Sequence, residues 1–295
     1  MLYLVAIVLL NTFLFSLFKL FPKYKVDNLQ AIVVNYFTCV ITGSIFLGEF
    51  PISRQSLSQP WFPWAILMGA MFISVFNLIA WRTCEDGMTT TTVANKLSLV
   101  IPVLFSIFLY DERFSLMKGV GIAVAFPAVY LTTRVAGEDK TPRSFLFPAL
   151  LFIGSGLLDT LVKYAEDRFL SNSHDQAAYT IHVFAAASIL GFLLVATLVA
   201  RKKIALHWRN IIAGVILGVP NYFSIFLLIK LLHSDFLQSS AAIPVNNIGI
   251  VLLSSLTAIL FFKEKLTWQR LLGLILSIAA ILLIALSDLN GRIQI

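Results

Sequence analysis

DERFSLMKGVG, residues 111–121, recurs later in the chain as KEKLTWQRLLG at residues 263–273. Both copies contain, in the same order, a glutamate, a basic residue, an apolar residue, a Ser or Thr, another basic residue and a glycine. When the alignment of residue 111 with residue 263 is extended toward the N-terminus, it pairs Val93 with Val245 and Asn95 with Asn247. This spacing predicts that the chain contains two copies of one structural unit.

The composition places these units in a membrane. Of the 295 residues, 59% are hydrophobic and 13% are charged, whereas a soluble domain carries about 25% charged residues. Apolar runs of about twenty residues, the length that crosses a ~30 Å hydrocarbon core, recur throughout the chain. The predicted spans are 2–21, 29–48, 62–81, 88–109, 115–133, 145–164, 176–199, 209–231, 236–261 and 266–287.

The polar connector 134–144 divides these spans into five and five. We therefore predict an all-α membrane protein with ten transmembrane helices in two five-helix repeats, 1–137 and 143–289. Because five is odd, the second repeat enters the bilayer inverted relative to the first. Inverted repeats are typical of alternating-access transporters, which bind substrate near the midplane between the repeats.

The repeated motif contains three pairs of residues with expected structural roles. The hydroxyl residues can cap the helices that follow them, the glycines allow close helix contact, and the glutamates are expected to cap or form ion pairs rather than to bind substrate. The pairs are Ser115 and Thr267, Gly121 and Gly273, and Glu112 and Glu264.

Ten spans, two five-span halves and the E-[RK]-[FL]-[ST] signature after spans four and nine resemble the EamA-type transporters of the drug/metabolite transporter superfamily. The resemblance covers nearly the whole chain. It implies secondary transport, often export, of small metabolites or drugs across a prokaryotic cytoplasmic membrane. It also implies a central cavity lined by spans one, three, four, six, eight and nine, but it does not indicate a particular substrate.

Two charged residues lie deep within predicted spans. Lys96 is about 12 Å from the start of its span at 1.5 Å per residue, so we expect it to face a wet cavity or a carboxylate. Asp159 lies one helical turn before Lys163 and could neutralise it. Alternatively, Asp159 reaches across to Lys96, or it gains and loses a proton during transport. For Lys19, Lys163 and Lys230, nearer to span ends, we expect snorkelling to the interface.

The remaining polar residues of the spans complete the predicted site. Thr92, Asn95, Lys96 and Leu99 form one stripe along span four, and Pro102 predicts a bend in that span. A single Asn in a span bonds a neighbouring helix more often than a ligand. The predicted substrate-binding residues are Lys96, Asn95, Thr92, Asn77, Asn221, Tyr222, Asn246 and Asn247, with Asp159 as the coupling residue.

The sequence offers nothing for catalysis. It has no HExxH motif, Ser/His/Asp set or phosphate-binding glycine loop, so we expect no enzyme activity, cofactor or metal. The net charge of +7 comes mostly from basic residues at span ends, which indicates lipid interfaces rather than nucleic acid. Cys39 and Cys84 are expected to be small packing residues.

These observations predict a secondary active transporter, favoured as an exporter, of small organic metabolites or drugs in a prokaryotic inner membrane. Alternating access would be coupled to protons or to exchange, and the protein would be a monomer or homodimer. The alternative is a non-transport membrane scaffold or a lipid scramblase.

The orientation of the chain in the membrane has two conflicting indications. Lys and Arg are more frequent in the connectors after the odd-numbered spans, which by the positive-inside rule places both termini outside. The family resemblance implies termini in the cytoplasm, and the sequence leaves both orientations open.

Overall fold

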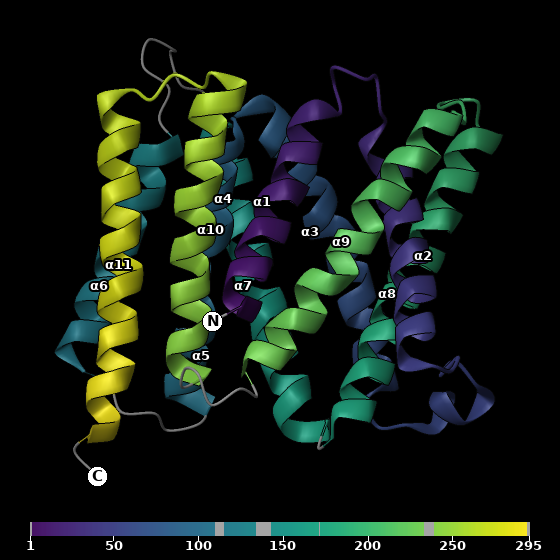
Figure 1. The fold of residues 1–295 in the computed structure, drawn as a ribbon, viewed down its shortest axis with the longest axis horizontal. Helices are drawn as coiled ribbons and strands as arrows, with labels where there is room; N and C mark the ends of the chain where they lie inside the picture. Colours follow the sequence, from purple (N-terminus) through teal and green to yellow (C-terminus); the bar gives the residue numbers. More distant parts are fainter. Residues whose placement is uncertain (1, 110–114, 134–142, 171, 233–238, 294–295) are drawn as a thin grey trace.

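A computed structural model describes residues 2–109, 115–133, 143–170, 172–232 and 239–293. Every regular element in these ranges is helical (Figure 1). The elements are α1 (Leu2–Leu20), α2 (Asn28–Leu47), η1 (Arg54–Ser58), α3 (Phe62–Glu85), α4 (Met88–Leu97), α5 (Val100–Leu109), α6 (Leu116–Thr133), α7 (Arg143–Phe169), α8 (Ser173–Ala200), α9 (Trp208–Leu232), α10 (Ser239–Phe262) and α11 (Trp268–Ile293).

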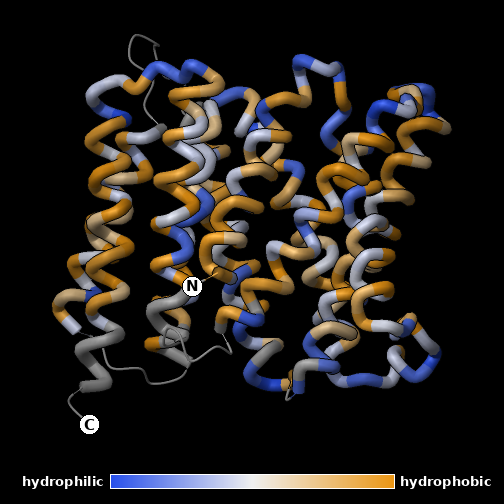
Figure 2. Tube along the Cα trace, in the orientation of Figure 1, coloured by the Kyte–Doolittle hydropathy of each residue, from blue (hydrophilic) through white to orange (hydrophobic). Residues whose placement is uncertain are grey.

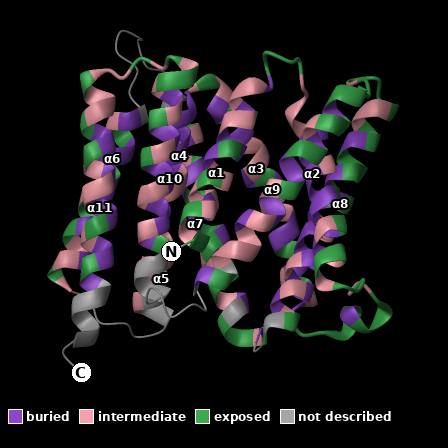
Figure 3. Cartoon of the chain, in the orientation of Figure 1, coloured by how far each residue is buried: buried purple, intermediate pink, exposed green. Residues whose placement is uncertain are grey.

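The helices confirm an all-α multi-pass membrane protein. In the described part of the chain, nine helical segments are long and apolar enough to cross a membrane, and Leu116–Thr132 is a shorter apolar helix. Figure 2 shows hydrophobic residues along the helices and hydrophilic ones mainly at the connections between them. Many large apolar side chains remain exposed on the outside of the bundle, as lipid contact requires (Figure 3).

The bundle has two flanks and a middle (Figure 1). On one flank α6 packs along α11, and on the other α2 packs along both α8 and α9. Between these flanks α4 contacts α7 and α10, and α1 contacts α9 and α10. The residues predicted to bind substrate are therefore carried partly by the middle helices.

Glycines bring the helices of the α2–α9 flank into close contact. A Cβ at Gly218 would lie 2.5 Å from the Cβ of Thr38 and 2.7 Å from the backbone oxygen of Asn35. A Cβ at Gly214 would lie 2.6 Å from the oxygen of Ala31. Since each glycine faces a backbone oxygen and the Cβ of a β-branched residue, a methyl group at these positions would have to push the helices apart.

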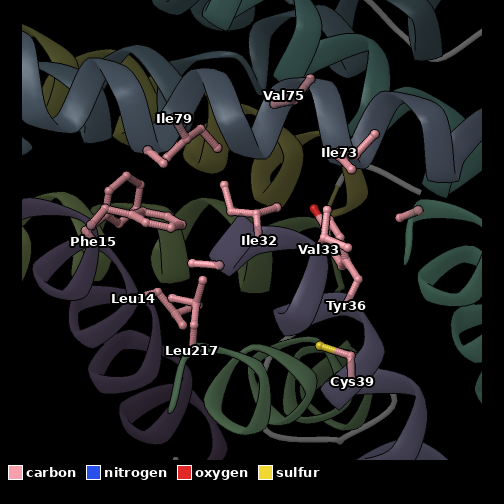
Figure 4. Close-up of a cluster of buried hydrophobic side chains, with 14 of the residues drawn as sticks. Leu14, Phe15, Ile32, Val33, Tyr36, Cys39, Ile73, Val75, Ile79 and Leu217 are labelled. Carbon is pink, nitrogen blue, oxygen red and sulfur yellow. The ribbon is translucent and has the colours of Figure 1, made fainter. Parts of the chain in front are cut away.

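The largest buried cluster lies where α1, α2, α3 and α9 meet (Figure 4). Tyr36 is fully buried there, and its hydroxyl donates to the oxygen of Phe72 at 2.9 Å. Cys39 is a fully buried free thiol that donates to the oxygen of Gly218 at 3.3 Å. Its predicted role as a small packing residue is confirmed.

The hydroxyl residues of the repeated motif cap their helices as predicted. The Ser115 hydroxyl accepts from the backbone N–H of Lys118 at 3.1 Å, and the Thr267 hydroxyl accepts from that of Arg270 at 3.4 Å. These bonds satisfy donors at the starts of α6 and α11 that the helices themselves leave unpaired.

The glycines of the motif also behave as predicted. A Cβ at Gly121 of α6 would lie 3.0 Å from the oxygen of Ala280 in α11, and a Cβ at Gly273 of α11 would lie 2.7 Å from the backbone nitrogen of Thr132 in α6. The two contacts are reciprocal, as a repeat with twofold pseudo-symmetry would require. The repeat boundaries themselves stay a prediction.

Span four is broken rather than bent. Helix α4 ends at Leu97 and α5 begins at Val100, two residues before Pro102. Proline cannot donate to the oxygen of residue 98, and that oxygen instead accepts from the N–H of Ile101 at 2.9 Å. The Ser98 hydroxyl in turn donates to the oxygen of Asn95 at 2.5 Å. The distortion predicted from Pro102 is confirmed, but the helix breaks before the proline, close to Lys96.

Candidate functional site

The first turn of α4 is held by an acidic side chain from the other half of the chain. The carboxylate of Glu264 accepts from the backbone N–H groups of Met88 at 2.7 Å and Thr89 at 3.3 Å. It also pairs with the Lys19 ammonium at 3.3 Å. The capping and ion-pairing role predicted for Glu264 is thus confirmed, while Glu112 lies outside the described residues.

Lys19 corrects an expectation. Instead of snorkelling to the interface, its ammonium group forms the ion pair with Glu264 and donates to the oxygen of Thr83 at 3.3 Å. The two partners lie on the α10–α11 connection and at the end of α3. A nearby carboxylate and carbonyl satisfy the ammonium group inside the protein, so the side chain need not reach open water.

Amide side chains connect the end of α4 to two neighbouring helices. The Asn95 amide nitrogen donates to the hydroxyl of Ser155 in α7 at 2.9 Å. The Asn247 amide nitrogen, from α10, donates to the backbone oxygen of Lys96 at 3.3 Å. Three middle helices therefore meet around Lys96, directly before the break in span four.

Lys96 and Asp159 bring opposite charges together from α4 and α7. Each is an electrostatic partner of the other, which is one of the two alternatives that the sequence left for Asp159. Lys96 is partly buried and Asp159 is exposed. The pair thus has accessible surface in a part of the bundle where lipid would not tolerate charge.

The exposure of Asp159 is directed away from lipid. Leu146, Leu150, Ile153 and Leu157 form one exposed apolar stripe along α7, and at 100° per residue Asp159 lies on roughly the opposite face. An exposed carboxylate on that face indicates a water-accessible interior rather than a lipid contact.

Burial along this inner face of α7 changes in one direction. Phe152 and Ser155 are buried, whereas Asp159 and Lys163, which follow at helical spacing, are exposed. Helix α7 runs from Arg143 to Phe169. The accessible surface therefore begins near Asp159 and continues toward the Phe169 end of α7.

Two other predicted site residues bond to their own helices. The Thr92 hydroxyl donates to the oxygen of Met88 at 2.8 Å, and the Asn77 amide donates to the oxygen of Ile73 at 2.8 Å. Thr92 is fully buried, whereas Asn77 is partly exposed. In this structure Thr92 offers a substrate no accessible surface.

Asn221 and Tyr222 lie in the contact between α2 and α9. The Asn221 amide donates to the side-chain oxygen of Asn35 at 3.1 Å, which is the helix-to-helix bonding that a lone Asn favours. The Tyr222 ring stacks on Phe226 with centroids 6.2 Å apart, and it also contacts Phe46. Among the described residues, no hydrogen bond joins Asn221 or Tyr222 to Lys96.

Asn246 is the predicted residue with unused bonding capacity. Its side chain is 3% exposed, and its amide oxygen is buried without a hydrogen-bond partner among the described residues. A buried unpaired acceptor is costly, and a ligand or a water molecule would satisfy this oxygen only after a movement that exposes it.

Ser155 was not predicted from the sequence. A serine beside a glycine in a span resembles an ordinary helix-packing residue, and only its position opposite Asn95 gives it a role.

The described residues contain no cluster of three or more metal-ligating side chains.

Comparison with known proteins places part of the chain beside one family. Residues 2–134 match the model of the EamA-like transporter family. This matched segment is similar to the EamA-like transporter family. The matched family is one of membrane transporters in the drug/metabolite transporter superfamily.

Two further similarities extend beyond the matched EamA segment. An uncharacterized protein of Haemophilus influenzae is 28% identical over 281 residues, which are 90% of this chain and 91% of that protein. A solved crystal structure of another protein superposes with a TM-score of 0.59 at 15% identity, over 94% of this chain and 97% of its own. At that identity the superposition shows a common fold alone.

Proposed function

We propose that the protein is a secondary active transporter of small organic solutes, which binds its substrate between α4, α7 and α10. The observation that carries this proposal is the accessible Lys96–Asp159 pair on the inner face of the bundle, beside the break in span four. Broken helices at the midplane supply free backbone groups and mobile ends, which transporters use for binding and for movement.

The polar residues around the pair have distinct proposed roles. Lys96 supplies a positive centre for an anionic group of the substrate. Asn95, held by Ser155, and the unpaired oxygen of Asn246 supply hydrogen-bonding groups. Asn247 bonds the oxygen of Lys96, which holds the end of α4 in place and leaves the Asn247 side-chain oxygen for a ligand.

Asp159 is the proposed coupling residue. A carboxylate beside a lysine can be neutralised by the lysine, by a proton or by a cationic group of the substrate. If proton and substrate compete for this group, the two must cross in opposite directions. A carboxylate-bearing or zwitterionic solute fits a site with one charge of each sign, and export is the proposed direction.

The test is flux in proteoliposomes, with substrates first found by a thermal-shift screen of metabolite mixtures. For an anionic substrate we expect Lys96→Gln to lower uptake at least tenfold, because the ion pair with the substrate is lost. We expect Asp159→Asn to abolish accumulation driven by a pH gradient while downhill exchange persists.

Matched controls come from exposed charges near the membrane ends. Lys230→Gln removes a lysine that contacts the Phe226 ring, and Asp167→Asn removes an exposed carboxylate of α7. Both should transport normally. Unchanged flux in Lys96→Gln would exclude the anion site, and lipid scrambling without solute flux would favour the scramblase alternative.

A further inference from the structure

Gly87, Glu264 and Lys19 form one compact contact at the end of the bundle where α1 and α3 finish and α4 begins. Gly87 has φ 100°, a backbone conformation that strongly favours glycine. A Cβ at Gly87 would lie 2.9 Å from an oxygen of the Glu264 carboxylate. The position thus requires glycine both for its backbone and to admit the acid.

The Glu264 carboxylate is delivered by the way α10 ends. Lys263 adopts φ 51°, and the N–H of Glu264 donates to the oxygen of Ala258 at 3.0 Å. The chain therefore turns sharply, and the acid faces the first turn of α4, where the backbone N–H groups and helix dipole favour a negative charge. Its side chain is only 12% exposed.

This end of the bundle is sealed. Met88, Thr89, Thr90 and Thr91 are each 3% exposed or less, although they lie in the first turn of α4. The accessible surface of the candidate site, by contrast, lies at Asp159 and continues toward the Phe169 end of α7. The described residues are therefore buried at the Glu264 end, whereas Asp159 and Lys163 are exposed farther along α7.

We propose that Glu264 is the latch of the transport path: its bonds to α4 and its ion pair with Lys19 hold this end closed, and their release opens it. The inference rests on the proposed alternating access. The latch joins the α10–α11 connection to α1 and α4. Those helices must separate for a substrate at Lys96 to leave through this end.

The bonds of Glu264 are both strong enough to hold this end closed and easily broken together. A carboxylate that accepts two backbone N–H groups and an ammonium ion makes strong, charge-assisted bonds. All of them come from one side chain on a short connection, so a single movement of that connection breaks them together. Interlocked apolar side chains would instead have to separate one by one.

The test is a distance between two spin labels across the latch, which requires no substrate. The labels replace the exposed residues Glu85 and Lys265, in a folded background with Cys39→Ala and Cys84→Ala. The parent protein should show a predominant short distance. Glu264→Ala should raise the ratio of long to short distances about tenfold, the expected result of losing a charge-assisted bond network.

Two further variants keep the test decisive if Glu264→Ala fails to fold. Glu264→Gln loses the charge but keeps an acceptor, and Gly87→Ala displaces the carboxylate; both should shift the distances in the same direction. Glu49→Ala is the matched control, because it removes an acid that pairs with His174 at 2.6 Å without touching α4.

Unchanged distances in the folded Glu264 and Gly87 variants would overturn the latch, even if their melting temperatures fall. A latch-dependent shift in a protein that moves no solute would support the latch and reject the transport proposal. The two ideas can therefore fail separately.

Discussion

Ser155 holds the amide of Asn95 across the contact between α4 and α7. This bond fixes which way the Asn95 side chain points and leaves its oxygen for a ligand. Ser155 is itself buried, so it acts through Asn95 rather than by contacting a substrate. Its expected effect is on substrate affinity.

We predict that Ser155→Ala raises the KM for transport about fivefold, the equivalent of one hydrogen bond of about 1 kcal/mol. Thr160→Val is the matched control, because the Thr160 hydroxyl bonds only within its own helix, to the oxygen of Gly156 at 2.7 Å. Initial transport rates in proteoliposomes, measured over a range of substrate concentrations, give the KM of each variant. Equal KM values for the two variants would contradict the role of Ser155.

Lys96 shows what the sequence can predict of such a site, and Ser155 shows what it cannot. A lysine well inside an apolar run is costly in lipid, so a wet cavity or a carboxylate beside it could be expected from its position. Whether Asp159 meets Lys96 or Lys163 could not be decided from the sequence. Ser155 carries no such cost in a helix, and its role depends on which helix faces it. Asn221 was predicted to bind substrate, but its amide nitrogen donates to the side-chain oxygen of Asn35 in a neighbouring helix.

Helices in this chain respond differently to proline. Helices α6, α7, α9 and α10 continue through Pro127, Pro148, Pro220 and Pro244, whereas span four breaks before Pro102. The break also involves the Ser98 hydroxyl, which bonds the oxygen of Asn95. Proline alone therefore predicts a weak point, and the surrounding bonds decide whether the helix parts there.

Helix contacts on the α2–α9 flank should be intolerant of added volume. We predict that Gly218→Ala lowers the free energy of unfolding by about 1–2 kcal/mol, because its methyl group would meet the Cβ of Thr38 and the backbone oxygen of Asn35, which cannot move aside without shifting α2. Gly154→Ala is the control, since its Cβ would meet only a side-chain methyl of Val75 at 3.1 Å. Thermal unfolding in detergent compares them, and similar melting temperatures would contradict the close contact.

The connections that the structure describes lie in two layers (Figure 1). The turns after α1, α8 and α10 share one face, and the segment between α2 and α3 lies on the other. The order of spans, and hence these layers, could be predicted from the hydrophobic runs alone. Orientation in the membrane could not, because the charge bias and the family resemblance disagree.

Accessibility to a membrane-impermeant maleimide should reveal these layers. We predict that single cysteines replacing Lys23, Lys202 and Lys265 react alike, and that one replacing Gln55 reacts from the opposite side; all four positions are exposed. The positive-inside rule predicts protection of the first three in intact cells and reaction after permeabilisation. Mixed behaviour among the first three would contradict the layered topology.

The contact between Gly87 and Glu264 also constrains how the gene can change. One residue is encoded in the first half and the other in the second, yet the missing side chain of Gly87 makes the space that the Glu264 carboxylate occupies. A substitution at position 87 or at position 264 therefore affects the other residue. A chimera that joins halves from two relatives needs a glycine in the first half and an acid in the second. Recombination between such genes should therefore succeed only where both parents carry the glycine and the acid.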